Sequence, residues 1–175
     1  MRIEFKQGDI THETGDAIVN AANERGLGGD GVDGAIHKAA GPALLAACQA
    51  LPEKAPGVRI PEGEAVATEA GNLPVKWVIH TVGPRWKGGE QKEEETLAKA
   101  YDNSLKVADE KGCKSVSFPS ISTGVYGYPI EKAAEVAIRT INAYGKTHPQ
   151  TNLKEVRMVL FSENDYNVYT KAYSF

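Results

Sequence analysis

Residues 17–37 read AIVNAANERGLGGDGVDGAIH, so that a short apolar segment passes directly into a glycine-rich one. The apolar segment, Ala17–Asn20, contains β-branched residues, which is typical of a buried strand. Glycines at positions 26, 28, 29 and 31 predict a loop, and apolar residues at helical spacing predict a helix from about Val32. This stretch therefore predicts a strand, a loop and a helix in direct succession.

The same order of elements recurs later in the chain. Ser115–Phe118 is a predicted strand, Pro119–Ile130 a glycine-containing loop and Ile130–Tyr144 a predicted helix. Further strands are predicted at Arg2–Phe5, Ala65–Ala70, Trp77–Val82 and Val156–Phe161, the first of them at a sheet edge. Further helices are predicted at Pro42–Gln49, Glu90–Glu110 and from about Asp165. This alternation predicts one α/β domain over residues 1–175, with a sheet that is parallel in its middle and covered by helices on both faces.

The composition narrows the class of protein. The chain is 41% hydrophobic and 25% charged with a formal net charge of −3, so it lacks the basic excess that bulk nucleic-acid binding needs. No apolar run approaches the ~20 residues of a membrane span. Cys48 and Cys113 match no metal or redox spacing, and Cys48 reads as a small buried hydrophobe. We therefore expect a cytoplasmic protein that is a monomer, with no metal ion, no cofactor and no membrane partner.

The first loop carries side chains suited to a sugar. Ligands of such folds sit at the carboxyl ends of the parallel strands, where this loop begins. Asn20 and Asn23 offer donors and acceptors to hydroxyl groups, and Asp33 can accept from a hydroxyl or polarise a water. The glycines let backbone approach a ligand, and the helix N-terminus offers free N–H groups to an anion. The alternative is a flexible loop in which Asp33 only caps the helix.

The second loop carries groups suited to phosphate. Ser120, Ser122, Thr123 and the backbone amides through Val125 form a concave nest for phosphate oxygens. Tyr126 either stacks on a sugar or packs against the protein. Parallel strands would bring both loops to the same edge of the sheet, and together they favour an elongated phosphate-containing ligand.

With these motifs in order, the chain resembles the macrodomain family, and within it the MacroD-type ADP-ribose hydrolases. The matching segments are Gly8–Thr11 (GDIT), Ile18–Asn23 (IVNAAN), Gly31–His37 (GVDGAIH), Ala39–Pro42 (AAGP), Ile79–Pro84 (IHTVGP) and Phe118–Gly127 (FPSISTGVYG). They span nearly the whole chain. The resemblance implies a three-layer α/β/α macrodomain with a central mixed sheet.

The resemblance also implies a role for each matching residue. Asp9 would accept from the adenine amino group, with the Ile10 backbone nearby. Asn164 and Tyr166 would lie near the same adenine end. Asn20, Asn23 and Asp33 would surround the distal ribose as the catalytic residues, and His37 would support them. The diphosphate would be held by Gly28, Gly29, Gly31 and Val32 on one side and by Ser120, Ile121, Ser122, Thr123, Gly124, Val125 and Tyr126 on the other, with Tyr126 against the distal ribose.

Proteins of this type hydrolyse esters of ADP-ribose without a metal ion. The resemblance implies that this chain binds ADP-ribose and its esters, deacetylates O-acetyl-ADP-ribose and removes mono-ADP-ribose from acidic side chains of proteins. A water between the diphosphate and Asp33 would attack the ester carbonyl or the anomeric carbon, and both centres stay open. The alternative is a reader that binds ADP-ribose without turnover. A nucleotide-dependent oxidoreductase is disfavoured because no clean dinucleotide fingerprint is present.

Asp30 departs from the family pattern, which usually has glycine at this position. A carboxylate beside a diphosphate would repel it by roughly 1 kcal/mol at ~4 Å in water. Glu24 and Arg25 also replace a small polar pair, and Arg25 is a cation that would offset Asp30. We therefore expect Asp30 either to weaken the binding of ADP-ribose or to point into solvent.

Overall fold

A computed structural model describes residues 1–174, and the core of the fold is a six-stranded sheet. Its strands are β1 (Arg2–Gln7), β2 (Gly15–Ala21), β3 (Ala65–Glu69), β4 (Val75–Thr81), β5 (Ser115–Phe118) and β6 (Glu155–Leu160). The spatial order is β1-β6-β5-β2-β4-β3. The pairs β1–β6, β6–β5, β5–β2 and β2–β4 are parallel, and the edge strand β3 is antiparallel to β4. The predicted mixed sheet with a parallel middle is confirmed, and β1 lies at an edge as expected.

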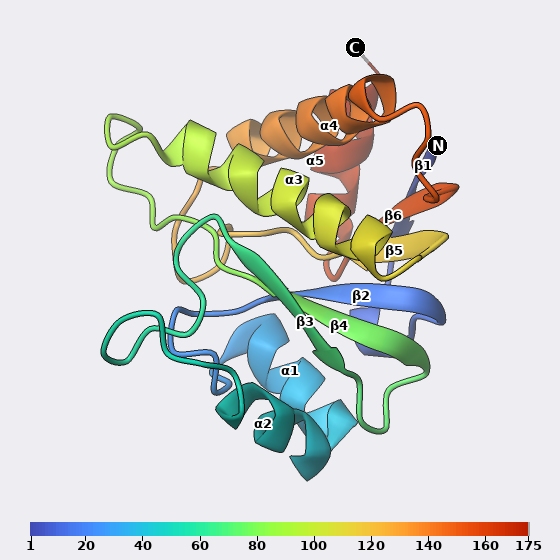
Figure 1. Cartoon of the computed structure of the whole chain (residues 1–175). Helices are drawn as coiled ribbons and strands as arrows, with labels where there is room; N and C mark the ends of the chain where they lie inside the picture. Colours follow the sequence, from blue (N-terminus) through green and yellow to red (C-terminus); the bar gives the residue numbers. More distant parts are fainter. Residues whose placement is uncertain (175) are drawn as a thin grey trace.

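Helices cover both faces of this sheet (Figure 1). They are η1 (Ile10–His12), α1 (Gly31–Ala40), α2 (Pro42–Gln49), α3 (Glu93–Glu110), α4 (Ile130–Thr147) and α5 (Glu163–Tyr173). Figure 1 shows α1 and α2 on one side of the sheet and α3, α4 and α5 on the other, which confirms the three layers. Leu97, Tyr101 and Leu105 of α3 are fully buried, as their helical spacing predicts. Cys48 of α2 is fully buried as well.

The starts of two helices differ by two or three residues from those predicted, and side-chain hydrogen bonds explain why. Helix α3 begins at Glu93 and not Glu90, because the Glu93 carboxylate accepts the backbone N–H groups of Lys87, Gly89 and Gln91 at 2.5–2.9 Å and holds the preceding residues in a turn. Helix α5 begins two residues before Asp165, because Ser162 Oγ accepts the Asp165 N–H at 3.1 Å and caps an earlier first turn.

The central position of β2 places the two glycine-rich loops together. Ala17 and Ile18 of β2 pair with Val116 and Ser117 of β5, and the two strands run parallel. The loops that follow Ala21 and Phe118 therefore leave the sheet side by side at its carboxyl edge.

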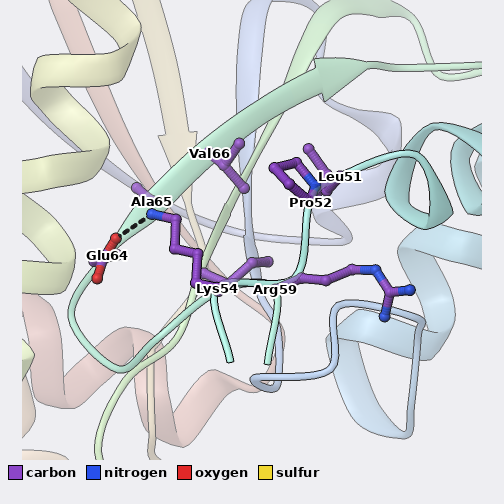
Figure 2. Close-up of a pocket in the computed structure, with 8 residues that line it drawn as sticks. Leu51, Pro52, Lys54, Arg59, Glu64, Ala65 and Val66 are labelled. Carbon is purple, nitrogen blue, oxygen red and sulfur yellow. Dashed lines mark hydrogen bonds and ion pairs between the residues drawn. The ribbon is translucent and has the colours of Figure 1, made fainter. Parts of the chain in front are cut away.

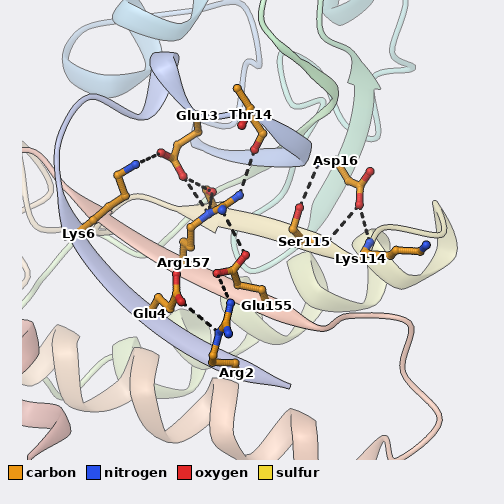
Figure 3. Close-up of polar contacts among 11 residues, drawn as sticks. Arg2, Glu4, Lys6, Glu13, Thr14, Asp16, Lys114, Ser115, Glu155 and Arg157 are labelled. Atoms are coloured by element: carbon orange, nitrogen blue, oxygen red, sulfur yellow. Dashed lines mark hydrogen bonds and ion pairs between the residues drawn. The ribbon is translucent and has the colours of Figure 1, made fainter.

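A cluster of charged side chains links β1, β5 and β6 at Glu13 (Figure 3). The Glu13 side chain is only 5% exposed. Its carboxylate accepts from Lys6 Nζ at 2.7 Å and from Ser117 Oγ at 2.8 Å, and it forms an ion pair with Arg157 Nε at 3.1 Å. A carboxylate removed from water remains charged at little cost only when donors surround it in this way. Glu13 therefore stabilises the packing of the N-terminal segment against the sheet.

We expect Glu13→Ala to lower the free energy of unfolding by about 2–3 kcal/mol, because it leaves Arg157 and Ser117 without their buried acceptor. The loss is smaller than for a fully buried pair, since Arg157 keeps a contact with Glu155 at 3.2 Å. Urea denaturation measures the change. Glu94→Ala is the matched control, because its ion pair with Arg139 is exposed and should contribute less than ~1 kcal/mol. Equal losses in the two variants would contradict the prediction.

Candidate functional site

A cavity of about 610 Å³ opens where the parallel strands end. It is lined by the residues that directly follow four of the parallel strands, namely Gly8 after β1, Ala22 and Asn23 after β2, Pro119–Tyr126 after β5 and Phe161 after β6. Its lining residues are Gly8, Asp9, Ile10, Ala21, Ala22, Asn23, Asp30, Gly31, Val32, Asp33, Ala35, Gly83, Pro119, Ser120, Ile121, Ser122, Thr123, Gly124, Val125, Tyr126, Val159, Phe161 and Asp165. Both glycine-rich loops therefore face one cavity, at the edge of the sheet where the sequence places a ligand.

Most of the predicted site residues line this cavity, and a few lie elsewhere. Asn20 is fully buried in β2, Gly28 and Gly29 lie in the first loop and His37 lies in α1, and none of these four residues lines the cavity. Asn164 and Tyr166 are not among the lining residues: Asn164 is exposed, and Tyr166 packs against the core. Helix α5 instead presents Asp165 to the cavity.

Phe161 is the clearest residue that the sequence reasoning missed. It was assigned to the last strand, but β6 ends at Leu160, and Phe161 is 81% exposed while lining the cavity. An aromatic residue directly after an apolar strand, followed by a Ser162 helix cap, was the signal that could have found it.

Asn23 holds the first loop in shape. Its Oδ1 accepts the Gly26 N–H at 3.2 Å, and its Nδ2 donates to the Gly28 carbonyl at 3.1 Å. Gly28 has a φ of +92°, which a residue with a side chain rarely adopts. These two bonds and the positive φ of Gly28 define a specific turn in the first loop.

Asp33 is buried in the first turn of α1 and does not cap it. The N-cap residue is Asp30, whose side chain makes no capping hydrogen bond. Asp33 Oδ1 accepts from Asn20 Nδ2 at 2.8 Å and lies 3.5 Å from His37 Nε2. Burial raises the pKa of Asp33 above its ordinary value, while the Asn20 hydrogen bond and the nearby His37 oppose that shift.

The second oxygen of Asp33 faces the Asn23 amide across Gly29. A Cβ placed on Gly29 would lie 3.2 Å from Asp33 Oδ2 and 3.2 Å from Asn23 Nδ2. A donor and an acceptor, both on residues that line the cavity, therefore approach each other beside Gly29. Gly34 is needed beside it, because a Cβ there would overlap the Gly29 carbonyl oxygen.

The second loop has a strained residue with an unpaired hydroxyl. Ser122 has a φ of +68°, and its buried Oγ has no hydrogen-bond partner among residues 1–174. Ser120 Oγ lies 2.7 Å from Thr123 Oγ1 and 2.7 Å from the hydroxyl of the buried Tyr169. Strain of this kind persists only where the surroundings hold it, and it concentrates at ligand sites. The Ser122 Oγ atom is buried against Gly83, where an added Cβ would overlap it.

Carboxylates supply the charge of the cavity wall. Within the described residues the lining contains Asp9, Asp30, Asp33 and Asp165 and no lysine, arginine or histidine. Hydrogen bonds from the Thr11 hydroxyl and N–H to Asp9 lower the pKa of that carboxyl. An anionic ligand at this wall therefore depends on backbone N–H groups and helix ends.

A second, smaller cavity lies under residues 51–66 (Figure 2). It measures about 120 Å³, and a Lys54–Glu64 ion pair of 2.5 Å closes one side of it. Arg59 extends away from it in Figure 2, and its Nη1 donates to the Arg25 carbonyl at 3.2 Å. The cavity is too small for a nucleotide and contains none of the predicted site residues.

Within residues 1–174, no helix is long and apolar enough to cross a membrane. No group of three or more His, Cys, Asp or Glu side chains in the same range is placed to hold a metal ion.

Known proteins are similar to this chain in both sequence and fold. The Macro domain family model matches residues 19–137. An O-acetyl-ADP-ribose deacetylase from Klebsiella pneumoniae is 53% identical over 94% of this chain and 91% of its own length. A macrodomain of Oceanobacillus iheyensis with ADP has a TM-score of 0.91 at 48% identity, over 98% of this chain and 90% of that chain. A Trypanosoma brucei macrodomain in complex with ADP-ribose has a TM-score of 0.87 at 37% identity, over 98% of this chain and 68% of that one. The chain belongs to the Macro domain family.

Proposed function

We propose that the protein binds ADP-ribose in the large cavity and hydrolyses its esters. The substrates are O-acetyl-ADP-ribose, which it deacetylates, and proteins that carry mono-ADP-ribose on acidic side chains. The Klebsiella pneumoniae relative bears the name of the first activity, and the Trypanosoma brucei relative was solved with ADP-ribose. The cavity volume of about 610 Å³ is in the range of pockets that hold a ligand as large as ADP-ribose.

In this proposal the ligand lies along the carboxyl edge of the sheet. The Asp9 carboxylate accepts from the adenine amino group, and Phe161 offers its exposed ring for stacking. The diphosphate lies between Gly31 and the second loop around Ser122, where the first turn of α1 and the second loop supply backbone N–H groups. The distal ribose then reaches Asn23 and Asp33.

The convergence of Asp33 Oδ2 and Asn23 Nδ2 at Gly29 carries the catalytic part of the proposal. A reader does not require a buried carboxylate and an amide donor that point at the same space beside the ribose. Asp33 Oδ2 accepts a proton from a water there, and the amide orients a ribose hydroxyl. If the water oxygen attacks the ester carbonyl, the bond from the acyl carbon to the ribose oxygen breaks, and the ribose oxygen takes the proton that Asp33 accepted. If it attacks the anomeric carbon, the bond from that carbon to the carboxylate oxygen breaks, and the carboxylate leaves without a proton at neutral pH. Most of the acceleration of hydrolysis comes from holding the water and the ester in the reactive geometry.

Release of product separates the hydrolase from the reader. Wild-type protein is incubated with O-acetyl-ADP-ribose and, separately, with a glutamate-linked mono-ADP-ribosylated protein, and the free ADP-ribose is followed by chromatography. We expect release from both substrates. Tight binding of ADP-ribose by calorimetry with no release from either substrate would establish the reader instead.

The dependence of kcat on pH should follow the protonation of Asp33. As the pH falls through the pKa of Asp33, its carboxylate gains a proton and can no longer accept one from water, so kcat is lost on the acid side. Because burial raises that pKa, the acid limb should lie above the range of an ordinary aspartate. Asn20→Ala removes the hydrogen bond that lowers the pKa of Asp33, so this variant should lose kcat at a still higher pH than the wild type. The assignment would be contradicted if kcat were lost only in the pH range of an ordinary aspartate and if Asn20→Ala did not change that pH.

Asp30 should weaken the binding of the diphosphate. It lines the cavity, is exposed and makes no side-chain hydrogen bond to the N-terminus of α1. Asp30→Gly and Asp30→Asn should each tighten ADP-ribose binding by roughly fivefold, which corresponds to about 1 kcal/mol. Calorimetry at low and high salt measures this, and the gain should shrink as salt screens the charge. Unchanged affinity in both variants would mean that the carboxylate does not face the diphosphate.

A further inference from the structure

A chain of buried polar side chains leads from Asp33 across the sheet, away from the cavity. Asn20 of β2 lies opposite His80 of β4 in the sheet register, and both are fully buried. Asn20 Nδ2 lies 2.8 Å from Asp33 Oδ1 and 3.1 Å from His80 Nδ1. His80 Nε2 lies 2.9 Å from Oγ1 of Thr68 on the edge strand β3. The proposed catalytic carboxylate is thus connected to the far edge of the sheet through three side chains.

The direction of each hydrogen bond follows from what its partner can donate. The Thr68 hydroxyl donates its single hydrogen to the Glu69 carbonyl oxygen at 3.1 Å, so its oxygen is left to accept. His80 Nε2 must then carry the proton that it donates to Thr68. Its Nδ1 is left bare and accepts from Asn20 Nδ2. Cys48 Sγ, 3.7 Å from His80 Nε2, is a weaker acceptor on the same side.

This tautomer and the Asp33 carboxylate together determine which way the Asn20 amide points. Its two N–H groups are both used, one by Asp33 and one by His80, while its Oδ1 has no hydrogen-bond partner within residues 1–174. A carboxylate accepts and does not donate, so the reverse orientation would turn the amide oxygen toward Asp33. Because burial lowers the pKa of His80 to about 3, the imidazole is neutral and keeps its bare nitrogen at every working pH.

We infer that His80 is a positioning residue for the hydrolysis: with Thr68, it holds the Asn20 amide so that Asp33 Oδ1 is fixed and Asp33 Oδ2 faces Asn23 across Gly29. This inference rests on the proposed function, because it gives His80 a part in the reaction that Asp33 performs. The competing interpretation is a core histidine that only fills space and satisfies its own nitrogens.

Thr68 offers the variant least able to disturb folding. Thr68→Val keeps the shape of the side chain but removes the acceptor that selects the His80 tautomer, whereas Thr68→Ser keeps the hydroxyl. We expect Thr68→Val to lower kcat on O-acetyl-ADP-ribose about 10-fold, within the range that outer-shell hydrogen-bond partners carry, with little change in ADP-ribose affinity. Thr68→Ser should retain most of the wild-type kcat.

A second pair of variants separates positioning from packing. His80→Leu approximates the volume of the imidazole without an acceptor, and His80→Asn is smaller but places an acceptor oxygen near the position of Nδ1. A packing role predicts that the leucine variant is the more active. The positioning role predicts the reverse, with kcat about 100-fold down in His80→Leu and partly restored in His80→Asn even where its melting temperature is lower.

Nitrogen-15 spectra of the His80 ring and the Asn20 side-chain amide test the geometry without any turnover. We expect the Nε2-protonated tautomer in wild type and Thr68→Ser, with slow exchange of the Asn20 amide hydrogens, and faster exchange in Thr68→Val. A ring protonated on Nδ1 in the wild-type protein would overturn the inference. So would equal kcat values for Thr68→Val and Thr68→Ser on a substrate that the wild type hydrolyses. Failure of the wild type on both esters would instead refute the proposed function, which is a separate result.

Discussion

Replacement of Asp33 by asparagine or alanine should lower kcat for O-acetyl-ADP-ribose and for glutamate-linked mono-ADP-ribose on the order of 10²- to 10³-fold, the range that a positioned proton acceptor supplies. The physical reason is that Asp33 Oδ2 is the buried acceptor that converges with the Asn23 amide on the space beside Gly29. Asp33→Asn keeps the shape of the side chain, so an effect on folding should be small. Steady-state kinetics with both substrates measures the loss.

Affinity and a second aspartate provide the controls for Asp33. ADP-ribose binding by calorimetry should change far less than kcat in Asp33→Asn, because the diphosphate and adenine contacts remain. Asp30→Asn removes another carboxylate of the same cavity and should leave kcat near the wild-type value. Full turnover in Asp33→Ala would show that the water is activated elsewhere, and an equal loss in Asp30→Asn would point to a general effect of cavity charge.

Substitution of Gly83 by alanine should weaken ADP-ribose binding by about 10- to 100-fold. Gly83 follows β4, and an added Cβ would overlap Ser122 Oγ and approach Ile121 Cγ2 to 2.6 Å. Ser122 already has a φ of +68°, so the second loop has no relaxed conformation into which to retreat. Overpacking of this kind costs about 1–3 kcal/mol, and here the displaced segment is the one that should hold the diphosphate. Calorimetry with ADP-ribose measures the change.

Gly145→Ala is the matched control for this substitution. Gly145 lies in α4 away from the cavity, and an added Cβ meets only the flexible end of the Met1 side chain at 3.2 Å. Its affinity for ADP-ribose should equal that of the wild type. Wild-type affinity in Gly83→Ala would mean that the second loop does not form the diphosphate site, whatever its effect on melting temperature.

Part of the site followed from local sequence, and part did not. The first loop was readable because its glycines, Asn23 and Asp33 lie within eleven residues and pass from a strand into a helix. Phe161 was missed because the pattern of apolar residues does not show where β6 ends. Asn164 and Tyr166 were placed toward the ligand by resemblance, yet the Ser162 cap sets the start of α5 so that Asp165 faces the cavity.

The sequence by itself determined the alternation of strands and helices, the two glycine-rich loops and the residue types they carry, because periodicity, glycine conformations and helix caps act over a few neighbouring residues. Only the tertiary structure decided that β2 lies between β5 and β4. That order brings Ser122 against Gly83 and lets His80 accept from Asn20, residues that lie 39 and 60 positions apart in the chain. Contacts of this kind depend on how the sheet packs, since strand order is set by the burial of whole faces and not by local pattern.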